Sequence, residues 1–187
     1  MCQMKNSGSI EVICGPMFSG KTEALIKQAR KELINNQNIH VFKPSIDNRY
    51  SNSNVVSHSK NKIECTVVNS AIEILNFSKN KNTILIDEAQ FFDEKIIDVC
   101  QELAKNGKKI IIAGLDRDYE AKPFGQMTNL ISISNNTTKL TSTCSICKKT
   151  AEYSFRITEE VNQVLIGESE KYEPRCESCY YNKKESK

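Results

Sequence analysis

The chain has 187 residues, of which 39% are hydrophobic and 26% are charged, and its formal net charge is +3. This length allows one ordinary domain with a small appendage, so a protein with two motor domains is excluded. The small net charge argues against a long nucleic acid as partner. No apolar run approaches the roughly 18–20 residues that cross a bilayer, and the N-terminal residues lack the apolar segment of a secretory signal, so we expect a cytoplasmic protein without a membrane partner.

Apolar runs alternate with helix-compatible stretches up to about residue 135. This alternation predicts a parallel sheet with helices on its faces and right-handed crossovers, which is the α/β class. The elements expected in chain order are a strand over 10–14, a helix over 21–33, a strand over 40–43, a loop or loose hairpin over 44–62, a strand over 63–68, a helix capped by Ser70, a strand over 83–87, a helix opened by Asp93 and stopped by Asn106-Gly107, and a strand over 109–114.

The pattern changes after about Asn136, where the long helical stretches end. Two pairs of cysteines lie in the remaining chain, and short strands are predicted over 152–157 and 161–166. We therefore expect two units, a larger one over 1–138 and a smaller one over 139–187.

A glycine-flanked loop follows the first predicted strand and matches the pattern G-x-x-x-x-G-K-[ST] at every required position. In such a loop, backbone N–H groups and the N-terminus of the next helix surround phosphate oxygens, the lysine adds a point charge, and the final hydroxyl can bind Mg²⁺. The sequence therefore predicts that the larger unit binds a nucleoside triphosphate. The residues of this phosphate loop are Gly15, Pro16, Met17, Phe18, Ser19, Gly20, Lys21 and Thr22.

Two carboxylates, Asp87 and Glu88, follow the apolar run over 84–86. An aspartate at the end of a buried strand is where P-loop proteins hold Mg²⁺, beside the hydroxyl of the phosphate loop. Glu88 can accept a proton from an attacking oxygen. These two residues do not decide whether that oxygen belongs to water, as in an ATPase, or to a substrate hydroxyl, as in a kinase.

Cysteines 144 and 147, and again 176 and 179, form C-x-x-C pairs separated by 28 residues. Four thiolates at this spacing predict a tetrahedral zinc site with no open position for water, which makes the metal structural. The zinc would stabilise a unit too small for a core of its own. Paired redox dithiols are the competing interpretation. The expected ligands are Cys144, Cys147, Cys176 and Cys179.

With these motifs in view, the chain resembles the type II thymidine kinase family from Ile10 to Cys179. The runs that carry the resemblance are Met17-Phe18, Asp87-Glu88-Ala89-Gln90-Phe91-Phe92, Gly114-Leu115-Asp116, Lys122-Pro123-Phe124-Gly125 and both cysteine pairs. The resemblance implies a P-loop NTPase fold of the RecA-like type as the ATP-binding domain over 1–138. It also implies a zinc-binding domain over 139–187 that carries a loop, the lasso, at about 158–173. The family is typically a homotetramer.

The resemblance further implies a reaction, transfer of the γ-phosphoryl group of ATP to the 5′-hydroxyl of thymidine, and also of deoxyuridine, in nucleotide salvage, with Mg²⁺ required. Glu88 would be the general base, and Lys21, Arg49 and Arg156 would neutralise charge on the phosphates. The ATP and magnesium site would comprise the phosphate loop with Asp87, Glu88, Ala89 and Gln90. The residues implied to hold the nucleoside are Met17, Leu115, Tyr119, Phe124, Ser154, Val164, Leu165, Ile166, Gly167 and Tyr172.

Three alternatives to this function stay open at this point. The chain could be a P-loop ATPase with a nucleic-acid-binding zinc ribbon, a nucleotide-dependent switch without turnover, or a kinase for another deoxynucleoside. The single motor domain and the small net charge argue against the first of these. Measuring ATP consumption with and without each nucleoside distinguishes all three from a thymidine kinase.

Overall fold

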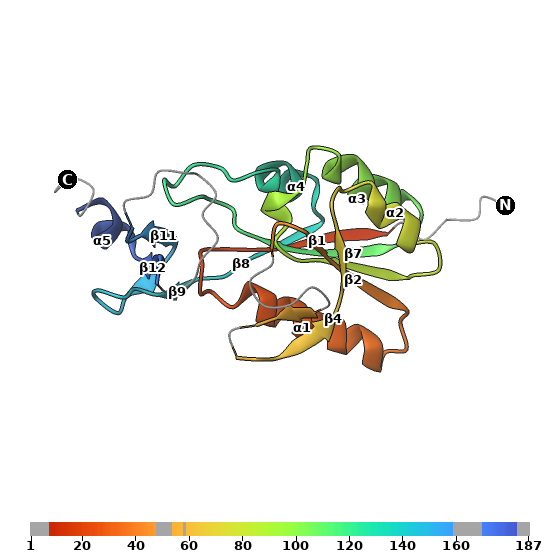
Figure 1. Ribbon diagram of the computed structural model, residues 1–187, viewed down its shortest axis with the longest axis horizontal. Coiled ribbons are helices and arrows are strands. Elements are labelled where there is room, and N and C mark those ends of the chain that lie inside the picture. The colour runs from red at the N-terminus through yellow and green to blue at the C-terminus, as the bar shows by residue number, and fades with distance from the viewer. Residues whose placement is uncertain (1–7, 48–53, 58, 159–169, 183–187) are drawn as a thin grey trace.

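A computed structural model describes residues 8–47, 54–57, 59–158 and 170–182 (Figure 1). Its centre is a six-stranded sheet in the order β5-β2-β6-β7-β1-β8, in which every neighbouring pair is parallel. The sheet strands are β1 (Ser9–Cys14), β2 (Ile39–Pro44), β5 (Thr66–Val68), β6 (Thr83–Ile86), β7 (Lys109–Gly114) and β8 (Asn136–Lys139). The predicted parallel α/β sheet is confirmed.

Helices cover both faces of this sheet, and the strand residues alternate between them (Figure 1). Buried apolar residues form one cluster on each face of the sheet. Ile110 and Ile112 of β7 belong to the cluster on one face, whereas Ile111 and Ala113 belong to the cluster on the other. The first side is covered by α2 (Glu73–Phe77), α3 (Ile96–Lys105) and α4 (Met127–Ile133), and the second by α1 (Lys21–Ile34). Burial on both faces explains why the central strands are continuous apolar runs.

The single strand predicted over 63–68 is wrong, because two separate strands occupy that range. β4 (Lys62–Glu64) pairs antiparallel with β3 (Asn54–Val56), whereas β5 pairs parallel with β2 in the main sheet. A hairpin, one of the two forms predicted over 44–62, is present as β3 and β4, but its second strand extends beyond that range to Glu64. Cys65 separates the two strands, so the apolar pattern continues while the chain changes its pairing partner.

The starts of two helices also differ from prediction. Helix α2 has Ile72 at its N-cap, and the Ser70 hydroxyl donates to the Glu73 carboxylate instead of capping the backbone. Helix α3 begins at Ile96, later than predicted, with Lys95 at its N-cap. Asp93 Oδ1 accepts from Lys95 N, as a capping side chain does, but it does so in the turn before the helix, and Asp93 Oδ2 accepts from Ala71 N. The predicted stop at Asn106-Gly107 is confirmed, since Asn106 is the C-cap and Gly107 has φ 77°.

The smaller unit lies beyond the carboxyl ends of the sheet strands (Figure 1). It contains β9 (Ser142–Thr143), β10 (Thr150–Ala151), β11 (Tyr153–Arg156), β12 (Tyr172–Arg175) and α5 (Glu177–Tyr181). Strand β11 matches the strand predicted over 152–157, and it pairs antiparallel with β12. The strand predicted over 161–166 lies outside the described residues. No helix in the described part of the chain could span a membrane.

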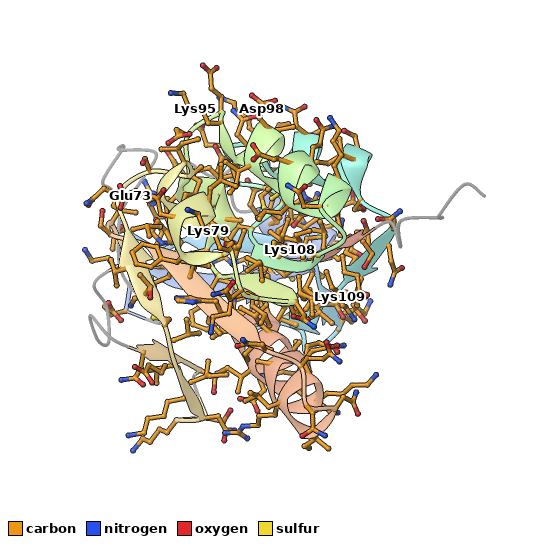
Figure 2. All side chains as sticks on the ribbon, turned by 90° about the vertical axis from the view of Figure 1, so that its right-hand side faces the viewer. Glu73, Lys79, Lys95, Asp98, Lys108 and Lys109 are labelled. Atoms are coloured by element: carbon orange, nitrogen blue, oxygen red, sulfur yellow. The ribbon has the colours of Figure 1, made fainter. Side chains whose placement is uncertain are left out.

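The opposite end of the sheet carries a cavity of about 530 Å³, on the side that Figure 2 presents to the viewer. Lysines line it, and the ammonium groups of Lys108 and Lys109 contact other residues at this end of the fold. Lys108 Nζ donates to the carbonyls of Lys79 and Lys81, and Lys109 Nζ contacts the carboxylates of Glu11 and Glu32. The residues predicted to carry chemistry lie at the other end, where parallel strands of α/β proteins present their ligand sites.

Candidate active site

The phosphate loop lies between β1 and α1, and its backbone adopts conformations that few residues tolerate. Gly20 has φ 83° and is the N-cap of α1, and Phe18 has φ 62° although it carries a side chain. A Cβ on Gly15, which has φ 142°, would lie 2.2 Å from the Leu140 carbonyl oxygen. The glycine at that position therefore lets the chain before β9 pass directly over the loop.

Two side chains of the loop point back onto its own backbone. Lys21 Nζ donates to the Pro16 carbonyl at 2.7 Å, and Ser19 Oγ donates to the same oxygen at 2.8 Å. The ammonium group is thus held inside the turn of the loop, where backbone N–H groups and a helix N-terminus also concentrate positive charge. The loop as a whole fits an anionic phosphate chain.

Asp87 directly follows β6 and lies next to the phosphate loop. Its Oδ2 accepts from Thr22 Oγ1 at 3.2 Å, and its backbone N–H donates to the Phe42 carbonyl. Burial raises the pKa of Asp87, and the carboxylate of Glu88 raises it further. A cation beside this carboxylate would favour its ionised form, and a hydroxyl with a carboxylate oxygen is a donor set that suits Mg²⁺.

Glu88 begins the short 3₁₀ helix η1 (Ala89–Phe91), and its φ of 51° lies in the left-handed region. For a residue with a Cβ this conformation costs about 1–2 kcal/mol, so neighbouring contacts have to maintain it. Gln90 supplies one of them, because its Nε2 donates to Glu88 Oε2 while its Oε1 accepts from Leu115 N at 3.0 Å. A Cβ on Gly125 would lie 2.0 Å from the Gln90 carbonyl oxygen, which shows how closely the next loop packs here.

Gln90 was predicted within the ATP site, and the structure places its side chain as a bridge between Glu88 and the segment after β7. That segment begins with Leu115. The side-chain amide of Gln90 thus holds both the predicted base, Glu88, and the first residue of the predicted nucleoside pocket, Leu115. Gln90 is 3% exposed.

Apart from Met17 on the phosphate loop, the predicted nucleoside residues of the larger unit lie on the segment between β7 and α4. The Phe124 ring is buried and makes an edge contact with Phe91, with 5.6 Å between ring centroids. The backbone carbonyl of Tyr119 accepts from the hydroxyl of Tyr180 on α5, at 2.7 Å. The segment is therefore anchored on both units of the protein.

Arg156, on β11, lies between two of the predicted nucleoside residues. Its guanidinium carbon is 3.6 Å from the ring centroid of Tyr119, and its Nη2 donates to the Tyr172 hydroxyl at 2.6 Å. Ser154 on the same strand accepts from Met17 N at 2.9 Å, so strand β11 joins the aromatic cluster to the phosphate loop. The structure thus brings residues from both units together at the carboxyl end of the sheet.

Other predicted site residues lie outside the described residues. These are Arg49, Val164, Leu165, Ile166 and Gly167, and the lasso is described only at its two ends.

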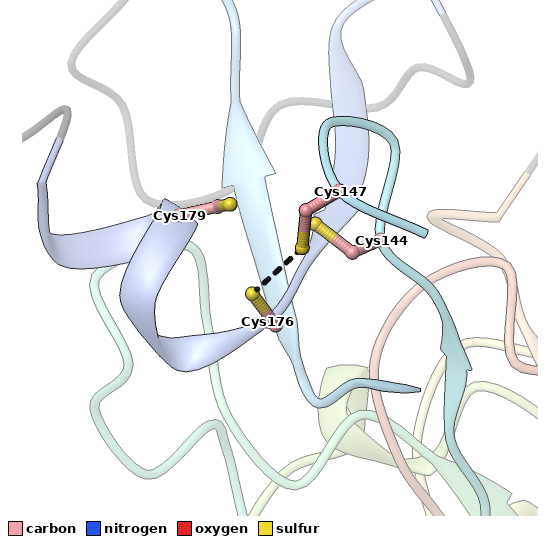
Figure 3. Close-up of side chains that lie close together, drawn as sticks. All are labelled: Cys144, Cys147, Cys176 and Cys179. Carbon is pink, nitrogen blue, oxygen red and sulfur yellow. Dashed lines mark hydrogen bonds between the residues drawn. The ribbon is translucent and has the colours of Figure 1, made fainter. Parts of the chain in front are cut away.

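The four predicted metal ligands converge in the smaller unit (Figure 3). Their sulfur atoms all lie within 4.8 Å of one another, and Cys147 Sγ is 3.4 Å from Cys176 Sγ. Burial alone would raise the pKa of the Cys144 thiol, but backbone N–H groups of Cys147, Cys176 and Ile146 lower it to about 6. A cluster of four sulfur donors, of which Cys144 has a stabilised thiolate, fits a metal ion that prefers thiolates.

Sequence reasoning did not include Ser142, Lys43 or Asp47 among the residues of this site. Ser142 Oγ on β9 donates to the Phe18 carbonyl at 3.0 Å, and Lys43 forms a buried ion pair with Asp47 at 3.8 Å near Asp87. A serine has no distinguishing sequence pattern. Asp47 stands in the run that includes Arg49, which is the only local sign that it belongs to the site.

Comparison with known proteins decides the family. A family model described as thymidine kinase matches residues 8–180. The chain belongs to the thymidine kinase family. The thymidine kinase of Rhodothermus sp. is 46% identical over 92% of this chain and 81% of its own length, and that of Porphyromonas gingivalis W83 is 47% identical over 92% and 85%.

Among solved structures, the Legionella pneumophila ATPase DotB matches 68% of this chain and 34% of its own, at 17% identity and a TM-score of 0.42, too low a likeness to support an inference. The family membership, the parallel sheet and the phosphate loop together establish the P-loop fold class predicted from the sequence and imply the use of ATP. The chain is accordingly an enzyme of the kinase class, with a cysteine cluster that could bind zinc.

Proposed function

We propose that this member of the family is a thymidine kinase that transfers the γ-phosphoryl group of ATP to the 5′-hydroxyl of thymidine, giving dTMP and ADP. The observation that supports it best is the position of Glu88. Glu88 follows Asp87, and Asp87 contacts Thr22 of the phosphate loop. The Glu88 carboxylate is linked through the Gln90 side chain to the segment that begins at Leu115. A base placed between a phosphate site and a nucleoside pocket suits a kinase better than an ATPase.

In the proposed reaction, the 5′-oxygen of the nucleoside forms a bond to the γ-phosphorus while the bond to the bridging oxygen of ADP breaks. Glu88 accepts the proton that the 5′-hydroxyl loses. Lys21 and the N–H groups of the phosphate loop hold the phosphate oxygens, and we assign Arg49 and Arg156 to the neutralisation of charge at the transferred group. Positioning and charge therefore carry most of the acceleration.

Mg²⁺ is the proposed cofactor, and Thr22 with Asp87 would hold it. When bound, it neutralises negative charge on the phosphates. The oxygen donors of these two residues, 3.2 Å apart, fit a small divalent cation, with Asp87 acting directly or through water.

Thymidine is the proposed acceptor, with Leu115, Tyr119, Phe124 and Met17 around the nucleoside and the lasso closing over the base. One methyl group in an apolar pocket is worth about 1–3 kcal/mol, so deoxyuridine should be a weaker substrate of the same site. From the family resemblance we also propose a cytoplasmic homotetramer, which sedimentation analysis of the purified protein would test.

The experiment that tests this function is transfer of labelled γ-phosphate from ATP to each of the four deoxynucleosides. We expect labelled dTMP as the dominant product, weaker labelling of deoxyuridine in an added assay, and little ATP consumption without a nucleoside. If ATP consumption without any nucleoside equalled that with thymidine, the result would favour the ATPase alternative. A dominant product from another deoxynucleoside would contradict the proposed specificity.

Replacing Lys21 with alanine is expected to weaken ATP use strongly, because the variant loses the ammonium charge held inside the phosphate loop. The measurement is the KM for ATP and kcat under saturating thymidine. Lys27→Ala is a matched control, since Lys27 is an exposed lysine on the same helix and should leave both constants unchanged. Unchanged kinetics in the Lys21 variant would contradict the assigned role.

A further inference from the structure

The phosphate loop contains a peptide segment, at Met17 and Phe18, that side chains from the cysteine-bearing unit contact. Phe18 adopts φ 62° at the tip of the loop, a region that residues with a Cβ rarely occupy. Ser19 Oγ and Lys21 Nζ both donate to the Pro16 carbonyl, which lies before this segment. Groups that bind the Met17 and Phe18 backbone therefore help to set how the loop is presented to a ligand.

Two serines of the cysteine-bearing unit make those contacts. The hydroxyl of Ser142 donates to the Phe18 carbonyl at 3.0 Å, and the hydroxyl of Ser154 accepts from Met17 N at 2.9 Å. Ser142 thus binds a backbone acceptor, the Phe18 carbonyl, and Ser154 binds a backbone donor, the N–H of the neighbouring Met17. Such a pair fixes the orientation of the backbone between them, because rotation would break both bonds.

The two serines are themselves tied to the cysteine cluster through short lengths of strand. Ser142 lies two residues before Cys144 and pairs with Ala151 across β9 and β10. Ser154 is paired with Pro174, two residues before Cys176. Each serine is therefore connected to a different cysteine pair, so a metal that draws the pairs together also sets the distance between the two hydroxyl groups.

We infer that Ser142 is a positioning residue for ATP, which acts with Ser154 to hold the phosphate loop from the cysteine-bearing unit. This inference rests on the proposed function, because it assigns the ligand of the loop as ATP. It gives the cysteine cluster a task beyond local stability, since the cluster places the hydroxyl groups that orient the loop. Ser142 is the cleaner probe of the pair, because Ser154 also belongs to the proposed nucleoside site.

The test is Ser142→Ala in the full-length protein. We expect the KM for ATP to rise roughly three- to tenfold, the change that loss of one hydrogen bond produces, while the KM for thymidine and the thermal midpoint stay near wild type. Calorimetry with a non-hydrolysable ATP analogue should show the same loss in affinity without turnover. Ser142→Thr, which keeps the hydroxyl, should restore both values.

Ser145→Ala is the matched control, because Ser145 lies in the same unit and donates to a backbone carbonyl, that of Pro174, without contacting the phosphate loop. It should leave the KM for ATP unchanged. A wild-type KM for ATP in Ser142→Ala, or an equal rise in Ser145→Ala, would overturn the inference while leaving the proposed function intact. A wild-type protein that phosphorylates no nucleoside would instead overturn the proposed function itself.

Discussion

The Glu88→Gln variant is expected to lose thymidine kinase turnover by about 10²–10⁴-fold, the range typical of removing a general base. The amide cannot accept the proton of the 5′-hydroxyl at neutral pH. Its oxygen can still accept the hydrogen bond from Gln90, so the left-handed turn at Glu88 should keep its support. The phosphate loop is unchanged. We therefore expect kcat to fall while ATP binding is retained.

The measurement is steady-state kcat together with the affinity for a non-hydrolysable ATP analogue and the thermal midpoint. Glu94→Gln is a suitable control, because Glu94 is an exposed carboxylate in the segment between η1 and α3 and should leave kcat unchanged. Near-normal turnover in Glu88→Gln would remove Glu88 from the role of base. A loss of ATP binding equal to the loss of turnover would point instead to a contribution in holding the triphosphate.

The Cys144→Ser variant should lose its metal and most of its kinase activity. We expect about one zinc ion per chain in the wild-type protein, since four thiolates complete a tetrahedral shell. Cys144 is fully buried, and its thiolate is favoured by backbone N–H groups, so a serine hydroxyl there is a poor replacement. Because Ser142 lies two residues away, the phosphate loop should also lose a contact when the unit loses its order.

Metal content by mass spectrometry, limited proteolysis and kcat/KM for ATP measure these effects. Cys65→Ala is the control for thiol removal, because Cys65 lies between β4 and β5, away from the cluster, and its loss should leave the zinc content unchanged. Full activity in metal-free wild-type protein would contradict a structural metal. One zinc per chain and normal proteolytic resistance in Cys144→Ser would show that this residue is not a ligand.

The sequence predicted the elements correctly where buried apolar residues follow one another in a regular pattern along the chain. Strands β6 and β7 are apolar at almost every position because helices cover both faces of the sheet, and that pattern is visible without coordinates. The prediction was off by a few residues at two helix starts. The Ser70 hydroxyl donates to the Glu73 carboxylate, and Asp93 accepts from Lys95 N in a turn that precedes the helix, so both helices begin later than predicted.

At the site too, the sequence predicted local motifs but not contacts between residues far apart in the chain. The phosphate loop and the cysteine pairs are compact in sequence, so spacing alone predicts what they bind. The bond from Met17 N to Ser154 joins residues 137 positions apart, and that from Ser142 to Phe18 joins residues 124 apart. No local pattern distinguishes these serines from any other serine on a short strand.

The amino-acid sequence by itself determined the fold class, the triphosphate loop, the acidic pair after a buried strand and the cysteine set, because each depends on residues close together in the chain. Only the tertiary structure decided that Gln90 bridges Glu88 to Leu115, and that the small unit holds the backbone of the phosphate loop. The physical reason is that a hydrogen bond requires an approach of about 3 Å between two atoms. For residues far apart in the chain, that approach follows from the packing of the whole sheet and the unit beyond it.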